Sequence, residues 1–75
     1  MFKKWFKIKR NRIAQVQFII EGYEGMAMVT TMDPQAAIIQ VSIIPDFFYD
    51  ITNLLENLKN EYELKEIECK PGNRR

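Results

Sequence analysis

Two short segments of this 75-residue chain carry side chains whose types and spacing could do chemistry. The first, called the basic segment below, interleaves cations with an aromatic ring through Lys3, Lys4, Trp5, Lys7, Lys9, Arg10 and Arg12. Cations can meet phosphates while an indole stacks on a base, so this pattern is typical of single-stranded nucleic-acid binding. The plainer interpretation is a solvated strand whose lysines are partly neutralised by Glu66 and Glu68. If the segment were helical, it would instead resemble a short interfacial membrane anchor.

The second segment, residues 21–25, combines Glu21, Tyr23 and Glu24 with two glycines. As a ligand-binding loop, it would let a ligand approach the glycine backbone while the tyrosine and the acids supply polar contacts. The two acids would repel a phosphate, so an anionic ligand is not expected there. The alternative is a helix end and a tight entry into the next strand, because glycine commonly ends helices.

Catalysis and metal binding are not expected from this composition. The chain has no histidine, the side chain that most readily acts as a base near neutral pH. Its single cysteine, Cys69, lies in an acidic stretch, and one thiol cannot build a zinc site. We expect Cys69 to be a small core residue. The sequence therefore predicts a non-enzymatic protein with no metal and no cofactor.

Hydrophobic periodicity predicts two helices and four strands in the order β-α-β-β-α-β. Apolar residues recur at helical spacing over residues 12–20 and, more strongly, over residues 47–62. Two strand-like runs lie within residues 26–44, and shorter β-prone runs lie near both ends. This order is the split βαβ arrangement of ferredoxin-like domains. We expect one α+β domain, residues 1–70, with a four-stranded antiparallel sheet, two helices on one face, and a flexible basic tail at 71–75.

Alternation along the strands assigns their faces. Phe6 and Ile8 should face the helices, because a face made of lysines cannot be buried unpaired. In the strand before the central turn, the pattern favours Ala27 and Val29 inside. A shift of one residue would bury the opposite face instead, so this register stays open. The outgoing strand should bury Ala37, Ile39, Val41 and Ile43.

The last strand is expected to turn Ile67 and Cys69 toward the helices and its acids outward. Lys7 and Lys9 would then face Glu66 and Glu68 on the outer surface of the sheet. That surface would also be apolar, with Trp5, Met26, Met28, Met32, Ile38 and Ile44. A large exposed apolar patch usually marks an interface, so we expect a homodimer through this face or a sheet edge.

Charge is distributed unevenly, although the net charge is only +1. Residues 1–12 carry +6, residues 13–69 carry −8 and residues 70–75 carry +3. This asymmetry indicates a charged partner. The longest apolar stretch, residues 36–44, is far shorter than the roughly 20 residues that span a bilayer. The basic start is not followed by the apolar run of a secretory signal, so a cytoplasmic location is expected.

The helix end EGYEG at residues 21–25 is followed by a strand with a threonine–methionine–aspartate turn at residues 31–33. An apolar strand, a proline and a helix come next. This arrangement resembles a family of short uncharacterised bacterial proteins, catalogued as domain of unknown function 4911, over roughly residues 6–62. The resemblance implies a small cytoplasmic bacterial protein. Because the family has no established activity, no site residue can be taken from it.

The sequence thus predicts a non-enzymatic ligand-binding or regulatory module that acts as a homodimer. Its ligand is expected beside Glu21, Tyr23 and Glu24, near the dimer interface. The alternative is a single-stranded nucleic-acid-binding module that uses the basic segment. A third class is an adaptor whose exposed sheet edge captures a strand of another protein.

Overall fold

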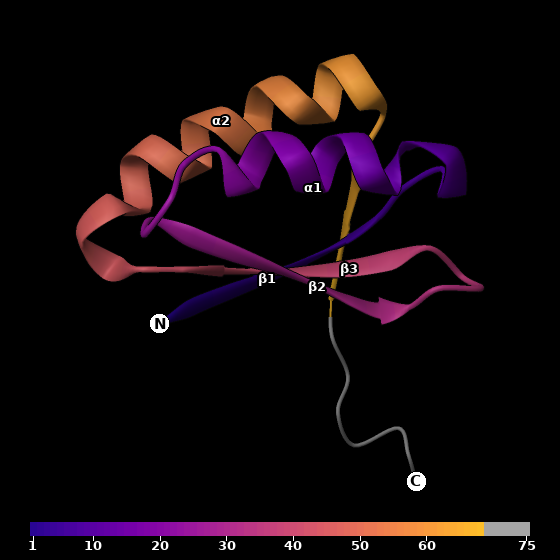
Figure 1. Ribbon diagram of the computed structural model, residues 1–75, viewed down its shortest axis with the longest axis horizontal. Coiled ribbons are helices and arrows are strands. Elements are labelled where there is room, and N and C mark those ends of the chain that lie inside the picture. Colours follow the sequence, from indigo (N-terminus) through magenta and orange to yellow (C-terminus); the bar gives the residue numbers. More distant parts are fainter. Residues whose placement is uncertain (69–75) are drawn as a thin grey trace, which may run out of the picture.

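The computed structural model describes residues 1–68, which form four strands and two helices in the predicted order (Figure 1). Two short 3-10 turns precede the helices. The elements are β1 (Phe2–Lys7), η1 (Arg10–Arg12), α1 (Ile13–Glu21), β2 (Ala27–Asp33), β3 (Ile38–Ile43), η2 (Pro45–Phe47), α2 (Phe48–Tyr62) and β4 (Lys65–Ile67). Cys69 and the predicted tail at 71–75 lie outside the described residues.

The strands form one antiparallel sheet in the order β2-β3-β1-β4. Both helices lie over the same face of this sheet, as Figure 1 shows. β1 and β3 are the central strands, whereas β2 and β4 are the edges. The predicted ferredoxin-like α+β fold is therefore confirmed, and within residues 1–68 no element covers the second face of the sheet.

The core lies between the helices and the central strands. Phe6 of β1 and Ile39 of β3 are direct cross-strand neighbours and are both fully buried. Ile20 of α1 and Ile51 of α2 belong to the same buried cluster. Each such side chain contributes about 1.5–3 kcal/mol when it is removed from water. The cluster is completed by Ile8, Val16, Ala27, Ala37, Val41, Ile43, Leu55, Leu58 and Leu64, so the inward faces predicted for β1 and β3 are confirmed.

The register of β2 is the one that the sequence favoured. Ala27 is buried and Val29 packs against the core, while Met28 and Met32 are 61% and 50% exposed. Met26, expected on the outer face, instead packs against the core. It precedes β2 in the turn after Gly25, where its backbone N–H donates to the Tyr23 carbonyl oxygen at 3.0 Å. Strand alternation therefore does not apply to it.

The face predicted for the last strand is wrong. β4 pairs with β1 so that Glu66 lies opposite Phe6 and Ile67 lies opposite Trp5. Glu66 thus shares the helix-covered face, and Ile67 lies on the outer face. The reason is Leu64, which is only 6% exposed and takes the first inward position after α2. Since side chains alternate along a strand, Leu64 places Glu66 on its own side of the sheet.

The end of α2 requires an unusual backbone conformation. Glu63, the residue after the helix, has φ 58° and ψ 42°, in the left-handed region. This conformation costs a residue with a Cβ atom roughly 1–2 kcal/mol, and glycine avoids most of that cost. The reversal directs the chain from α2 to Leu64 and β4.

We predict that Glu63→Gly unfolds at a higher urea concentration than Glu63→Ala, by a difference of about 1 kcal/mol in unfolding free energy. Both variants remove the same exposed carboxylate, so the alanine variant is the matched control. The comparison isolates the left-handed backbone, and equal stabilities would show that residue 63 is not strained.

Candidate functional site

Residues 21–25 form the end of α1 and the turn into β2. Gly25, with φ 81°, makes the left-handed reversal, whereas Gly22 keeps helical angles. A shallow pocket of about 400 Å³ lies beside this turn and is lined by Glu21, Glu24, Gly25, Ala27, Met28 and Val29. Two of the three predicted ligand-binding residues therefore meet at one pocket on the β2 edge.

Tyr23 does not line this pocket. Its side chain is 40% exposed, and its backbone is fixed by a 2.9 Å hydrogen bond from its N–H to the Ile20 carbonyl oxygen. Glu21 accepts a 3.1 Å hydrogen bond from the Gln17 side chain, one helical turn earlier. The pocket is thus acidic, with one carboxylate oriented by α1 and a second on the turn.

The basic segment does not form one surface, because the fold divides it among three places. Lys3, Trp5 and Lys7 alternate along β1 on the outer face of the sheet. Lys4 lies on the opposite, helix-covered face. The remaining cations follow β1: Lys9 precedes the 3-10 turn η1, and Arg10 and Arg12 belong to it.

Trp5 is held in place on the outer face. Its indole N–H donates a 3.0 Å hydrogen bond to the Gln40 side-chain oxygen, and its cross-strand neighbours are Gln40 and Ile67. The ring is half-buried in this position. Trp5 therefore presents part of an ordered aromatic surface between Lys3 and Lys7 on a central strand.

Lys4 has a partner inside the domain. Its Nζ atom lies 3.2 Å from Glu66 Oε2, and Lys59 Nζ of α2 lies 3.1 Å from Glu66 Oε1. Lys59 also contacts Glu56 at 3.0 Å. One carboxylate of β4 thus joins β1 to α2, and Lys4 is committed to this network.

The network changes the titration of two of its members. Partial burial opposes the ionisation of Glu66, but the hydrogen bonds from Lys59 and Lys4 outweigh it, so the pKa of Glu66 lies below its ordinary value. The hydrogen bond to Glu56, followed by that to Glu66, raises the pKa of Lys59. Both shifts favour the charged forms that the ion pairs require.

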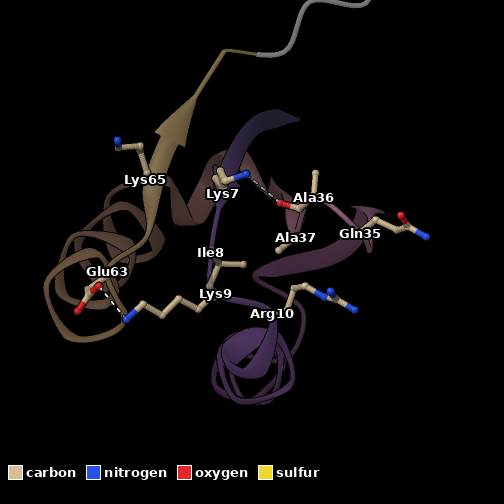
Figure 2. A pocket seen from close by; sticks show the side chains of 9 residues that line it. All are labelled: Lys7, Ile8, Lys9, Arg10, Gln35, Ala36, Ala37, Glu63 and Lys65. Atoms are coloured by element: carbon tan, nitrogen blue, oxygen red, sulfur yellow. Dashed lines mark hydrogen bonds and ion pairs between the residues drawn. The ribbon is translucent and has the colours of Figure 1, made fainter.

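A second pocket, of about 440 Å³, lies beyond the end of β1 (Figure 2). It is lined by Lys7, Ile8, Lys9, Arg10, Gln35, Ala36, Ala37, Glu63 and Lys65. We call it the cationic pocket. Lys65, Gln35 and Glu63 were not singled out in the sequence, because only the β1–β4 pairing and the β2–β3 turn bring them to this place. Arg12 is not among its lining residues, and its guanidinium lies 5.8 Å from the centre of the Tyr62 ring.

Within residues 1–68, no group of three or more metal-ligating side chains is found. No helix in that part of the chain combines the length and apolarity needed to cross a bilayer.

Comparison with known proteins gives one match. The family model described as a domain of unknown function (DUF4911) matches residues 6–61, which is well over half of the chain. No curated protein and no solved structure matches the chain. The resemblance stated from the EGYEG element is thereby confirmed.

We predict that Glu66→Gln lowers the unfolding free energy at pH 7 by about 0.5–1 kcal/mol, a modest value because the network is partly exposed. The pKa of Glu66 is depressed in the folded state, so its stabilisation is present above the ordinary value of 4.5 and is lost as pH falls through the folded pKa. Urea unfolding at neutral and acidic pH measures this difference. Glu68→Gln is the control, since Glu68 is exposed and makes no ion pair within residues 1–68. An equal loss in the control would contradict the role of Glu66.

Proposed function

Because the chain belongs to the DUF4911 family, a domain of unknown function, its role has to be inferred from its own residues, and we propose that it is a non-enzymatic ligand-binding or regulatory module that acts as a homodimer. The observation that carries this proposal is an unprotected sheet edge, β2, which adjoins the pocket of Glu21 and Glu24.

The two edges of the sheet differ in how they avoid pairing with another strand. β4 has only three residues, and two of them are the charged Lys65 and Glu66. Short length and charge are common protections of edge strands. β2 has seven residues and carries no charge before Asp33. A bulge between Thr31 and Asp33 disrupts only its last part. β2 is therefore the edge suited to receive a strand.

A second copy of β2 is a chemically matching occupant. In antiparallel pairing about a two-fold axis at Thr30, the middle of β2, Thr30 would face its own copy. Met28 would face Met32 of the second copy, and no like charges would oppose each other. The outer face of the sheet is less suitable for self-association, because Lys3, Lys7 and Lys65 would repel their copies.

The proposed interface would adjoin the acidic pocket, since Met28 and Val29 line that pocket and also belong to the β2 edge. A ligand bound by Glu21 and Glu24, with Tyr23 beside them, would then be close to both copies. Ligand binding and dimer formation would stabilise each other, which is a simple basis for regulation. The two carboxylates favour a ligand that carries a positive charge.

The non-enzymatic part of the proposal rests on composition. A chain without histidine lacks the usual neutral-pH base, and its one cysteine has no histidine to activate it. We also place the domain in the cytoplasm, because a single cysteine needs no oxidising compartment.

We predict a dimer, with twice the chain mass of 8.9 kDa, in size-exclusion chromatography with light scattering at micromolar concentration. Thr30→Lys should weaken the dimer at least about tenfold, because it places two like charges directly opposite each other in adjacent strands. Thr30 is exposed, so the monomer should fold normally.

Asn53→Lys is the matched control, since it adds the same charge at an exposed position of α2. A monomeric parent protein would refute the homodimer. A dimer that tolerates Thr30→Lys would assign self-association to another surface.

A second function is favoured by Trp5, which lies between two lysines on the uncovered sheet face. We propose single-stranded nucleic acid as the alternative partner, with a base stacked on Trp5 and phosphates near Lys3 and Lys7. Pairing through β2 would leave this face open, so the two proposals are compatible. Only part of the basic segment would take part, because Lys4 is bonded to Glu66.

We predict that a short oligouridine quenches the fluorescence of Trp5, the only tryptophan in the chain. If Lys3, Lys7 and Lys65 supply the contacts, log K should fall with log salt with a slope of about −2. Lys3→Gln should weaken binding, whereas Lys4→Gln should not. Unchanged fluorescence at low salt with excess oligonucleotide would count against this function.

A further inference from the structure

We propose that the cationic pocket at the end of β1 binds a small phosphate-bearing molecule, a phosphomonoester in its dianionic form. This inference goes beyond the proposed function and does not depend on the dimer, although Lys7 and Lys65 are shared with the alternative nucleic-acid surface. The pocket lies near the start of α1, whereas Glu21 lies at the end of that helix. It forms where the β2–β3 turn meets the end of β1, away from the proposed dimer edge.

Four cations line the pocket, and they come from three elements (Figure 2). Lys7 and Lys9 belong to β1 and the segment after it, Arg10 begins η1, and Lys65 begins β4. Among residues 1–68, Glu63 is the only acid in the lining, and its Oε1 atom is already 3.2 Å from Lys9 Nζ. The lining therefore carries an excess of positive charge.

The strongest indication of an anion-binding site is the pairing of Lys7 with Lys65. These residues are direct cross-strand partners of β1 and β4 and lie on the same face of the sheet. Like charges in this position destabilise a sheet. Within residues 1–68 no carboxylate lies within 4.0 Å of either lysine, and residues 69–75 contain no Asp or Glu.

The neighbouring Lys4 is a lysine with a structural role, and its charge is balanced within the domain. Its ammonium is paired with Glu66, a residue adjacent to Lys65 in the chain. The same two strands thus supply a carboxylate on the helix-covered face and none on the outer face. Lys7 Nζ donates to the neutral Ala36 carbonyl oxygen, which does not balance its charge, whereas an anion in the pocket would lessen the repulsion between the two lysines.

The backbone adds to this positive potential. Arg10 and Arg12 precede α1, whose N-terminal end already carries partial positive charge, and the first turn of α1 contains no acid. Cations near the N-terminal end of a helix are unfavourable, because the helix dipole favours acidic side chains there. Arg10 is the one residue of η1 that lines the pocket, so this positive end lies next to the pocket and not inside it.

The wall of the pocket is fixed before any ligand arrives. The Ile8 N–H donates to the Ala37 carbonyl oxygen at 3.0 Å, and Lys7 Nζ donates to the Ala36 carbonyl oxygen at 3.3 Å. Ala37 has φ 59°, a left-handed conformation that is rare for alanine. These contacts hold the β2–β3 turn against the end of β1, as Figure 2 shows for Lys7 and Ala36.

The shape of the pocket selects the class of anion. Ile8 and Ala37, 4% and 3% exposed, give it an apolar floor beneath the cations. Its volume of about 440 Å³ lies in the range of small-molecule sites. A ligand with a charged phosphate and a compact organic body fits both features. Arg10 can offer two parallel N–H donors to phosphate oxygens, and the lysines supply point charges.

The test is calorimetric titration of the full chain at low salt with adenosine monophosphate, adenosine and pyrophosphate as probes. We expect the monophosphate and pyrophosphate to bind and adenosine to bind at least about tenfold more weakly, since each charge-assisted hydrogen bond is worth about tenfold or more. Lys65→Gln and Arg10→Gln should each weaken the monophosphate about tenfold. Glu63→Gln should tighten it, because it removes the only acid from the lining.

Asn53→Asp is the matched control, because it lowers the net charge by the same one unit at an exposed position of α2 outside the pocket. All these residues are exposed, so the variants should fold. No binding of the monophosphate at millimolar concentration would overturn the proposal, as would equal binding of adenosine. Equal weakening by Asn53→Asp would also overturn it, since the effect would then come from the net charge of the domain and not from the pocket.

A dinucleotide with a 5′ phosphate distinguishes the two sources of such a phosphate. Binding no tighter than that of the monophosphate assigns the pocket to a free phosphorylated metabolite. Much tighter binding, lost when the 5′ phosphate is removed, assigns it to a nucleic-acid end. Both outcomes support the phosphate site. Loss of the dimer in the Thr30→Lys variant with unchanged phosphate binding would separate this inference from the proposed function.

Discussion

The structure depends on the burial of one face of a small sheet. Phe6 and Ile39 meet on the central strands, and the apolar faces of α1 and α2, with Ile20 and Ile51, complete the same cluster. A domain of this size has few elements with which to cover apolar surface. Both helices are used on one side, so the candidate sites of residues 1–68 lie on the outer face, at the sheet edges and at the two ends of α1.

Leu64 has effects well beyond its own burial. Because it takes the inward position after α2, the short strand β4 is placed with Glu66 on the covered side and Lys65 on the outer side. Glu66 then joins Lys4 to Lys59, and Lys65 comes to lie beside Lys7. A single apolar contact thus produces both an internal ion-pair network and an unbalanced cationic pocket. The first stabilises the domain modestly, while the second has, in the described part of the chain, one ion pair, between Lys9 and Glu63, for its four cations.

The charges at the two ends of α1 are arranged against its dipole. Cations precede the helix at Arg10 and Arg12, and acids lie at its end in Glu21 and Glu24. Each misplaced charge near a helix end costs about 0.3–1 kcal/mol. The domain therefore has a basic pocket at one end of α1 and an acidic pocket at the other, the latter beside an edge strand with little protection. The proposed binding of charged molecules depends on this polarity.

The sequence by itself determined the order of elements, the fold class and most of the core, because periodicity of apolar residues records which face each segment buries. It favoured Ala27 and Val29 over Met28 and Met32 as the inward residues but left that register open, and its EGYEG element indicated the family. It did not determine the face of β4. Leu64 and Ile67 are three residues apart and so lie on opposite faces of a strand, and either could be the inward residue. The left-handed turn at Glu63 decides that Leu64 points inward. The basic segment is likewise continuous in the sequence, although the fold separates its side chains. Strand pairing places the Glu66 carboxylate beside Lys4 and places Lys65 beside Lys7. Such long-range neighbours arise only when distant segments pack together.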